Sequence, residues 1–509
     1  MMYYCGSRRS NIVRKWIGVR AELTHGYMLS KQNKLGQVQL QLLALTLVIP
    51  MWGLWVHSQY GGDLLGPMVA IAFSSIMGIV AINKVSRNLN IPRLSALGWL
   101  YILKISLVLF FVFQFWMPFV NQHVNYGFDP QRYYVESIQL LNNGFNPIAI
   151  CTGCDIESLR NVGVRYYYAV QMFALGANPI GPAMVNTFVS LMAALLVTTV
   201  FSHITSQKRH IPLLLGLLII IPETVWFDSI TGREAIVTAS LVFIILGMSS
   251  FILGFMQQGM SRWWLTSVPF AIFALVLVRP VMLLAAIATI ALISILVAFS
   301  MKRFLRASLL LAVLGTFAVG VPTLTTAIGS SMNELTFTYG TYLGSVTSGA
   351  TTTSQLWTSS SIGRLFVPTN IFESILFIPV RIVAHLLAPL PNINIFWATP
   401  LYIQHLVAVV SATIYLGFMP KVFASAYYAI RYVQYRGLLL MLLPLSVILL
   451  AVSWGQPFIH ERYRIMVIPF LVSSALLPVP KGSVTTIICF LWYGLMLMGS
   501  MLYVGYKLF

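Results

Sequence analysis

Long apolar runs constrain the fold of this chain more than any other feature. A helix needs about 20 apolar residues to cross a bilayer core, and such runs recur between residues 39 and 506. Backbone polar groups in lipid must be hydrogen-bonded within their own segment, so each run predicts an α-helix. Only 8% of residues are charged, against about 25% in soluble domains, which excludes an ordinary soluble protein.

The sequence therefore predicts an all-α polytopic membrane protein with about 13 transmembrane helices, within a range of about 11 to 14. Two shorter apolar stretches, 166–176 and 371–390, predict interfacial or re-entrant helices because they are short or broken by proline. The predicted spans lie near residues 39–57, 65–82, 99–119, 181–201, 211–227, 235–255, 263–278, 281–299, 307–328, 399–419, 437–453, 465–480 and 485–506.

Residues 1–36 predict a basic cytoplasmic segment ahead of a single transmembrane domain over residues 37–509. The segment is rich in Lys and Arg and has no apolar core of the needed length, so we expect no cleavable signal peptide. Because cytoplasmic loops keep the basic residues, the N-terminus is predicted to be cytoplasmic. Two long loops, about 121–165 and 329–370, then face outward and are expected to carry short helices.

Charges on the predicted outer face point to an anionic ligand. When the predicted spans cross the membrane in turn from a cytoplasmic N-terminus, every acidic residue except Glu22 lies outside. The positive-inside rule by itself would account for part of this asymmetry. The outer basic residues break that rule, and nearly all of them are arginine. Because arginine binds phosphate through a bidentate fork, the outer face predicts a site for a headgroup such as a lipid-linked phosphate or diphosphate.

The stretch GFDPQRYYVESIQLLNNG opens the first long loop. It predicts a short helix that starts at Pro130, is capped by Asp129 and carries Tyr133 and Glu136 on the same face. In one interpretation Asp129 is only a cap and Glu136 pairs with Arg132 at a wet surface. In the other, Asp129 is a general base beside the bilayer that accepts a proton from a sugar hydroxyl.

The same loop contains CTGCDIE. Cys151 and Cys154 favour a disulfide in an oxidising compartment, with two free thiols as the alternative, because no second cysteine pair or histidine completes a zinc site. Asp155 and Glu157 could hold a divalent cation through oxygen ligands. We assign no metal ligand and no certain cofactor from the sequence.

The segment IIPETVWFDSITGREAIV places four ionisable residues between two apolar helices. Pro222 is expected to break the helix there, so that backbone faces a polar cavity. Charges at a bilayer boundary are costly unless they are paired or functional. Arg233 and Glu234 either cap the next helix and pair with Asp228, or they form part of a site together with Glu223.

Two further outer segments carry arginine. Arg279 lies at a tight turn, and WGQPFIHERYRIMVIPFL places His460, Arg462 and Arg464 just before a span. Arginines often snorkel at helix ends, but this density of charge favours phosphate ligands. The Ser/Thr/Gly-rich loop 329–370 is either a connector or a lid over an acceptor.

The order of these segments resembles GT-C type membrane glycosyltransferases. DPQRYYVESIQLLNNGFNP followed by RYYYAVQMFALGANPIGPAMVNTFVSLMAALL is similar to their acidic first loop and following helices, while PETVWFDSITGREAIV and ERYRIMVIPFL are similar to later segments. The resemblance covers about residues 120–260 and 455–475. It implies that Asp129 is the catalytic or acceptor-activating acid, that Arg233 and Glu234 lie near a lipid-phosphate donor, and that Arg462 with Tyr463 contacts its phosphate.

The predicted function is a glycosyltransferase of the bacterial inner membrane that uses polyprenyl-phosphate- or diphosphate-linked sugars on the outer face, in cell-surface polysaccharide synthesis. Asp129, or else Glu234, takes the acceptor proton, and cationic residues stabilise the leaving phosphate. The candidate substrate- or phosphate-binding residues are Arg132, Arg233, Arg279, His460, Arg462, Tyr463 and Arg464.

Three alternatives remain open. More than one span precedes the acidic loop and no large soluble domain follows, so an O-antigen type polymerase of the same pathway is one alternative. A transporter or flippase of lipid-linked glycans is the second, but few mid-span charges favour an enzyme. A non-catalytic subunit is the third. Expected partners are the polyprenyl-linked glycan, membrane lipids and other polysaccharide-synthesis membrane proteins, with no nucleic acid.

Overall fold

Helices make up nearly all of the structure, which is a computed structural model. It describes residues 38–58, 64–117, 129–146, 162–205, 208–253, 260–261, 263–300, 376–387, 400–432, 437–455, 461–477, 479–480 and 482–508. These ranges contain no β-strand. The predicted all-α fold is therefore confirmed for the described part of the chain.

Six helices in the described ranges are long and apolar enough to cross a membrane. A seventh candidate is the pair α9 (His210–Ile220) and α10 (Pro222–Ser229), which bends by 42° at its break. These helices confirm a multi-pass membrane protein. The six are Val38–Ser58, α2 (Leu65–Leu89), Pro92–Trp116, α8 (Ile180–Ile204), α11 (Glu234–Ile252) and Leu406–Arg431, where Pro92–Trp116 joins η1 (Pro92–Leu94), α3 (Leu97–Phe111) and η2 (Val112–Trp116), and Leu406–Arg431 belongs to α19 (Pro400–Arg431).

Other predicted spans coincide with further apolar helices, namely α12 (Trp263–Val278), α13 (Pro280–Ser300), α20 (Leu439–Gly455) and α22 (Ser483–Leu508). The span expected at 465–480 is instead a 3-10 helix, η7 (Glu461–Val467), followed by the short α21 (Ile468–Leu476). Pro469 lies in the first turn of α21, where its missing N–H costs no hydrogen bond, so an α-helix begins there. The span expected near 307–328 and the N-terminal segment 1–36 lie outside the described residues.

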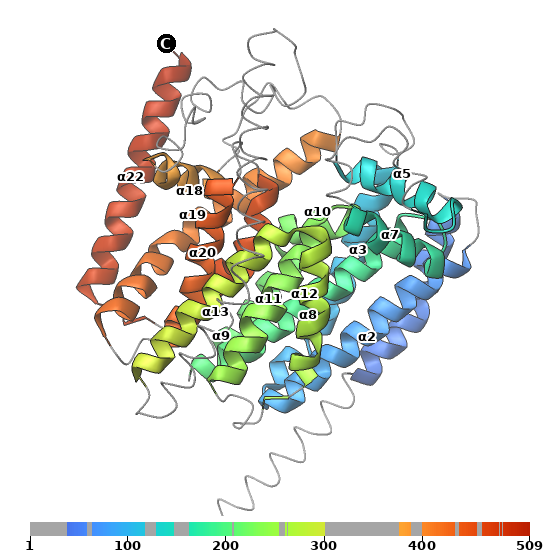
Figure 1. The fold of residues 1–509 in the computed structure, drawn as a ribbon, viewed down its shortest axis with the longest axis horizontal. Helices are drawn as coiled ribbons and strands as arrows, with labels where there is room; N and C mark the ends of the chain where they lie inside the picture. The colour runs from blue at the N-terminus through green and yellow to red at the C-terminus, as the bar shows by residue number, and fades with distance from the viewer. Residues whose placement is uncertain are drawn as a thin grey trace, which may run out of the picture.

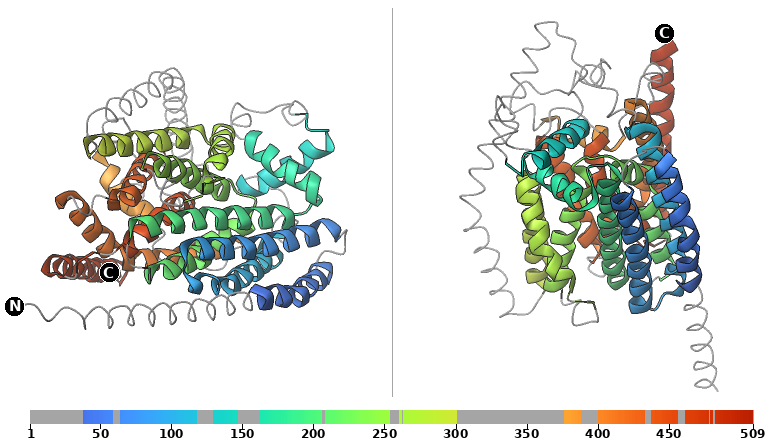
Figure 2. Two further views of the ribbon diagram at one scale, coloured as in Figure 1. Left: turned by 90° about the horizontal axis from the view of Figure 1, so that it is seen from below. Right: turned by 90° about the vertical axis from the view of Figure 1, so that its right-hand side faces the viewer.

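The helices form one bundle in which α11 packs between α8 and α12, and α2 packs on the far side of α8. Figure 1 shows α5 (Asp129–Asn142) and α7 (Val162–Leu175) packed together across one end of this bundle, and Figure 2 shows the first helices (blue) and α13 (yellow-green) on opposite flanks. We call the end that carries α5 and α7 the α5 end. A second short helix, α18 (Ile378–Leu387), packs against α19 and α20.

Close contacts between backbones hold the helices at the α5 end. A Cβ on Gly163 of α7 would clash with the carbonyl oxygen of Leu277 in α12, and a Cβ on Gly66 of α2 would clash with the carbonyl oxygen of Leu175. Large apolar side chains such as Phe270 are exposed at the periphery, as expected where lipid is the solvent. Lipid provides no hydrophobic driving force for association between helices. Small residues at the contacts let the backbones approach closely, and the resulting van der Waals packing stabilises the bundle.

We expect Gly163→Ala to destabilise the protein by about 1–3 kcal/mol, because α7 must move away from the backbone of α12. Gly417→Ala is the matched control, since a Cβ there meets nothing within 4 Å. Fluorescence-detected size-exclusion chromatography of heated, detergent-solubilised protein gives the melting temperatures. An equal melting temperature for the two variants would contradict this account of the α7–α12 contact.

Candidate functional site

A broken helix begins the candidate site. Ile221 ends α9 with φ −51° and ψ 126°, and Pro222 starts α10. A residue before proline is pushed out of the helical region, and proline itself donates no hydrogen bond, so the break follows from the sequence. The predicted break at Pro222 is confirmed, and it carries Glu223 and Asp228 into the bundle, where both are buried.

The turn between α10 and α11 is held by side chains from two other elements. Thr231 donates a hydrogen bond from Oγ1 to the carbonyl oxygen of Pro130 at 2.7 Å, and the Tyr168 hydroxyl donates to the carbonyl oxygen of Gly232. These bonds join the turn to α5 and α7. Glu234, the first residue of α11, is therefore held next to the start of α5.

An ion pair then joins the start of α5 to the late segment of the chain. Arg462 in η7 donates from Nη1 to Oδ2 of Asp129 at 2.5 Å, although 333 positions separate the two residues. The Asp129 side chain is 41% exposed and that of Arg462 is 21% exposed. A ligand can therefore reach this pair, unlike the fully buried pairs described below.

Arg279 and Arg462 both contact the aromatic ring of Tyr463. The Cζ of Arg279 lies 4.6 Å from the ring centroid of Tyr463, and Arg462 donates from Nη2 to the Tyr463 hydroxyl at 3.1 Å. Burial alone would raise the pKa of this hydroxyl, but the charges of Arg462, Arg279 and Arg233 outweigh it and hold the pKa below the ordinary value. The three arginines therefore favour negative charge at the position of the Tyr463 hydroxyl.

We call Asp129, Arg233, Glu234, Arg279, Arg462 and Tyr463 the arginine cluster. Its three arginines face two carboxylates, so the cluster has an excess of positive charge. Nη1 of Arg279, Nε of Arg462 and the neighbouring Tyr133 hydroxyl are buried and have no hydrogen-bond partner among the described residues. Buried donors of this kind need an acceptor, and an anionic oxygen of a ligand would supply one.

The structure brings together six of the nine predicted site residues in this cluster. It places Arg132 outside the cluster on the surface of α5, where its Nε donates to Oε1 of Glu136 at 2.9 Å. Glu136 also accepts from the buried Arg165 at 2.6 Å. The expected Glu136–Arg132 pair is present, but Glu136 is buried rather than at a wet surface. His460 lies outside the described residues.

Arg464 occupies a separate, closed network. It donates from Nη2 to Oε1 of Glu223 at 2.5 Å and from Nη1 to the carbonyl oxygen of Leu386 at 2.9 Å. The Tyr415 hydroxyl donates to Oε2 of the same Glu223 at 2.9 Å. Arg464 is fully buried, so the structure gives this predicted phosphate ligand a role in joining η7 to α10, α18 and α19.

Sequence reasoning missed a buried ion pair inside the bundle. Nζ of Lys104 in α3 lies 2.7 Å from Oδ2 of Asp228, and both side chains are buried. Ser190 of α8 donates to Oδ1 of Asp228 at 2.6 Å. The alternative that paired Asp228 with Arg233 at an outer surface is therefore wrong. A lone lysine within a predicted span was the available signal, because such a charge needs a partner.

The predicted disulfide or thiols at Cys151 and Cys154, the cation ligands Asp155 and Glu157, and the loop 329–370 lie outside the described residues. Within the described ranges, no three or more His, Cys, Asp or Glu residues gather closely enough to hold a metal ion. The divalent cation at the first loop remains a prediction.

No protein-family model, no curated protein and no solved structure matches this chain. The geometry of the arginine cluster therefore carries the functional argument. Its residues come from five separate elements or turns of the chain, which meet only in the folded bundle.

Replacing Arg464 with methionine should leave Glu223 buried without its main partner, at a cost of about 3–5 kcal/mol. We expect little folded protein after solubilisation, measured as the monodisperse fraction in size-exclusion chromatography. Adding Glu223→Gln to Arg464→Met should recover part of it, because the unpaired charge is then removed. Arg431→Met, at an exposed helix end, is the control, and equal loss in both single variants would contradict the structural role.

Proposed function

We propose that this multi-pass membrane protein is a glycosyltransferase that takes polyprenyl-phosphate- or diphosphate-linked sugar donors. The arginine cluster beside a half-exposed Asp129 carries the proposal. It offers cations for a phosphate and a carboxylate for a hydroxyl within one site at the end of a lipid-facing bundle. The resemblance of its segments to GT-C type enzymes supports the same reaction class.

The arginines would stabilise the leaving phosphate. As the bond between the anomeric carbon and the phosphate oxygen breaks, the electron pair stays on that oxygen, and Arg233, Arg279 and Arg462 offset the developing charge. Tyr463 holds Arg279 and Arg462 on its ring and hydroxyl. This contact keeps both guanidinium groups beside each other without a ligand, which reduces the reorganisation needed when the donor binds.

Donor binding would also prepare the base. Asp129 pairs with Arg462 when no donor is present, and a phosphate that binds Arg462 competes with this carboxylate. The released Asp129 then accepts the proton of the acceptor hydroxyl while the acceptor oxygen bonds to the anomeric carbon. Glu234 is the second candidate base, but it is buried and its carboxylate lies against Gly232, so an acceptor reaches Asp129 more directly.

The same chemistry serves an O-antigen type polymerase, in which the acceptor is itself a lipid-linked glycan. We place the protein in the bacterial inner membrane, with the α5 end facing the periplasm and other polysaccharide-synthesis membrane proteins as partners. The exposed apolar side chains around the bundle provide the lipid contact that a polyprenyl donor requires.

Asp129→Asn tests the proposal with an almost isosteric change. We expect a deletion strain complemented with this variant to lose or shorten its surface glycan, and Arg462→Ala to do the same, because the base and the phosphate ligand are removed. Glycan gels measure the product, with membrane levels of each variant matched by immunoblot. Arg431→Ala controls for removal of a charge elsewhere. Normal glycans from both site variants would refute the catalytic assignment.

The buried Lys104–Asp228 pair favours a second candidate, a flippase or transporter of lipid-linked glycans. Ionisable residues inside a membrane domain commonly mark ion or substrate pathways. Asp228 lies on the broken helix α10, as residues of transporter sites often do. An enzyme would depend on Asp129 and would consume the lipid-linked sugar donor. A transporter would depend on the Lys104–Asp228 pair and would leave the lipid-linked glycan intact.

Purified protein in liposomes separates the two candidates. An enzyme should transfer a radiolabelled sugar from polyprenyl-phosphate to an acceptor, and Asp129→Asn should abolish this transfer. A transporter should instead expose lipid-linked glycan to an external lectin without consuming it, and Lys104→Gln with Asp228→Asn should reduce that exposure. Lectin exposure without sugar transfer would replace the enzyme proposal with the transporter.

A further inference from the structure

A cavity of about 310 Å³ lies in the flank of the bundle between α2, α8 and the start of α12. It is formed where α2 ends, whereas Gly66 near the start of α2 contacts α7 at the α5 end. The cavity is therefore remote from the arginine cluster. Its volume is at the lower limit of ligand pockets, which span about 300–1,000 Å³.

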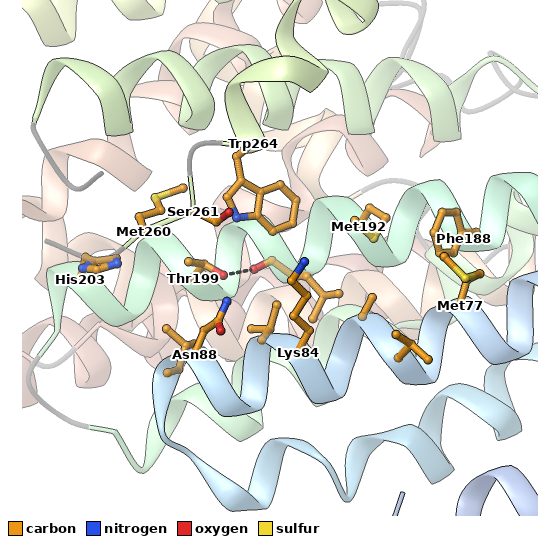
Figure 3. A pocket seen from close by; sticks show the side chains of 15 residues that line it. Met77, Lys84, Asn88, Phe188, Met192, Thr199, His203, Met260, Ser261 and Trp264 are labelled. Carbon is orange, nitrogen blue, oxygen red and sulfur yellow. Dashed lines mark hydrogen bonds between the residues drawn. The ribbon is translucent and has the colours of Figure 1, made fainter. Parts of the chain in front are cut away.

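One part of the cavity is apolar. Figure 3 shows Met77, Phe188 and Met192 together at one side, and Val80 and Leu195 also line it. Met77 and Val80 on α2 are 41% and 45% exposed. Because α2 is long and apolar enough to span a membrane, these exposed side chains face lipid, and the cavity is accessible to an acyl chain from the side.

The other part of the cavity is polar and basic. Figure 3 shows Asn88 and His203 at this side, with the Lys84 side chain reaching into the cavity. Lys84 and Asn88 belong to the last two turns of α2, and His203 belongs to the last turn of α8. An apolar wall that ends in a lysine at the end of a span fits an acyl chain beneath a negatively charged headgroup.

Local charge supports an anionic rather than a zwitterionic lipid. None of the residues that line the cavity is acidic. Arg87 in the last turn of α2 is also exposed. Because α2 is the second predicted span after a cytoplasmic N-terminus, this end of α2 is predicted to be cytoplasmic. Anionic lipids attract basic residues at the ends of spans, by about 1 kcal/mol for each residue.

We infer that this cavity binds one anionic phospholipid, with the phosphate beside Lys84 and an acyl chain along Met77, Phe188 and Met192. The lipid would fill the space between α2 and α12 across α8 and hold the ends of these helices together. The inference does not depend on the proposed glycosyl transfer, because the cavity and the arginine cluster share no residue.

Native mass spectrometry of the purified full-length protein tests the inference. The protein is delipidated in detergent and offered equal amounts of phosphatidylglycerol and phosphatidylcholine. Wild-type protein should retain one phosphatidylglycerol in preference, and Lys84→Gln should bind it about fivefold more weakly. Arg93→Gln is the matched control, since it removes one exposed charge outside the cavity.

A second variant tests the apolar wall. Met192→Trp enlarges a side chain that lines the cavity, so it should reduce retention of phosphatidylglycerol while size-exclusion chromatography confirms a folded protein. Equal retention of both lipids by the wild type would overturn the inference, as would equal loss in Lys84→Gln and Arg93→Gln. Undiminished retention by folded Met192→Trp would place the lipid elsewhere and would overturn it too.

Discussion

The ion pair between Glu223 and Arg464 is the interaction on which the candidate site most depends. It buries two full charges, which is tolerated only because Arg464 also donates to backbone carbonyls of Leu386 and Ala408. The pair fastens the broken helix α10 to η7, and Arg462 and Tyr463 directly precede Arg464. Arg462 lies only two positions before Arg464 in η7. The buried Glu223–Arg464 pair therefore helps to fix where the partly exposed Arg462–Asp129 pair lies.

The charges of the described chain fall into two kinds with different consequences. Glu223–Arg464 and Lys104–Asp228 are fully buried, so removing one partner alone leaves an uncompensated charge inside the bundle. Asp129–Arg462 is partly exposed, so a ligand can exchange with it. This difference in exposure, rather than the number of charges, is the reason why we propose that an anion binds at the arginine cluster.

Local sequence features predicted much of what the structure contains. The apolar runs located most of the helices, Pro222 located the break between α9 and α10, and Arg279 lies in the short connection before Pro280 as expected. Asp129, Arg233, Glu234, Arg279, Arg462 and Tyr463 were chosen from separate loops and meet in one cluster. The sequence predicted that these residues lie on one side of the membrane, because successive predicted spans run in alternating directions and place all of these loops on the same side.

The pairing of the charges could not be predicted in the same way. In the sequence, Arg464 was as good a candidate ligand as Arg462, and Asp228 was as good a candidate as Glu234. In the structure, Arg464 and Asp228 each form a buried ion pair. The sequence alone determined the helices, since backbone hydrogen bonds in lipid are satisfied within each segment. Only the tertiary structure decided which charges pair across 241 and 333 positions, because side-chain contacts between distant segments depend on how the helices pack.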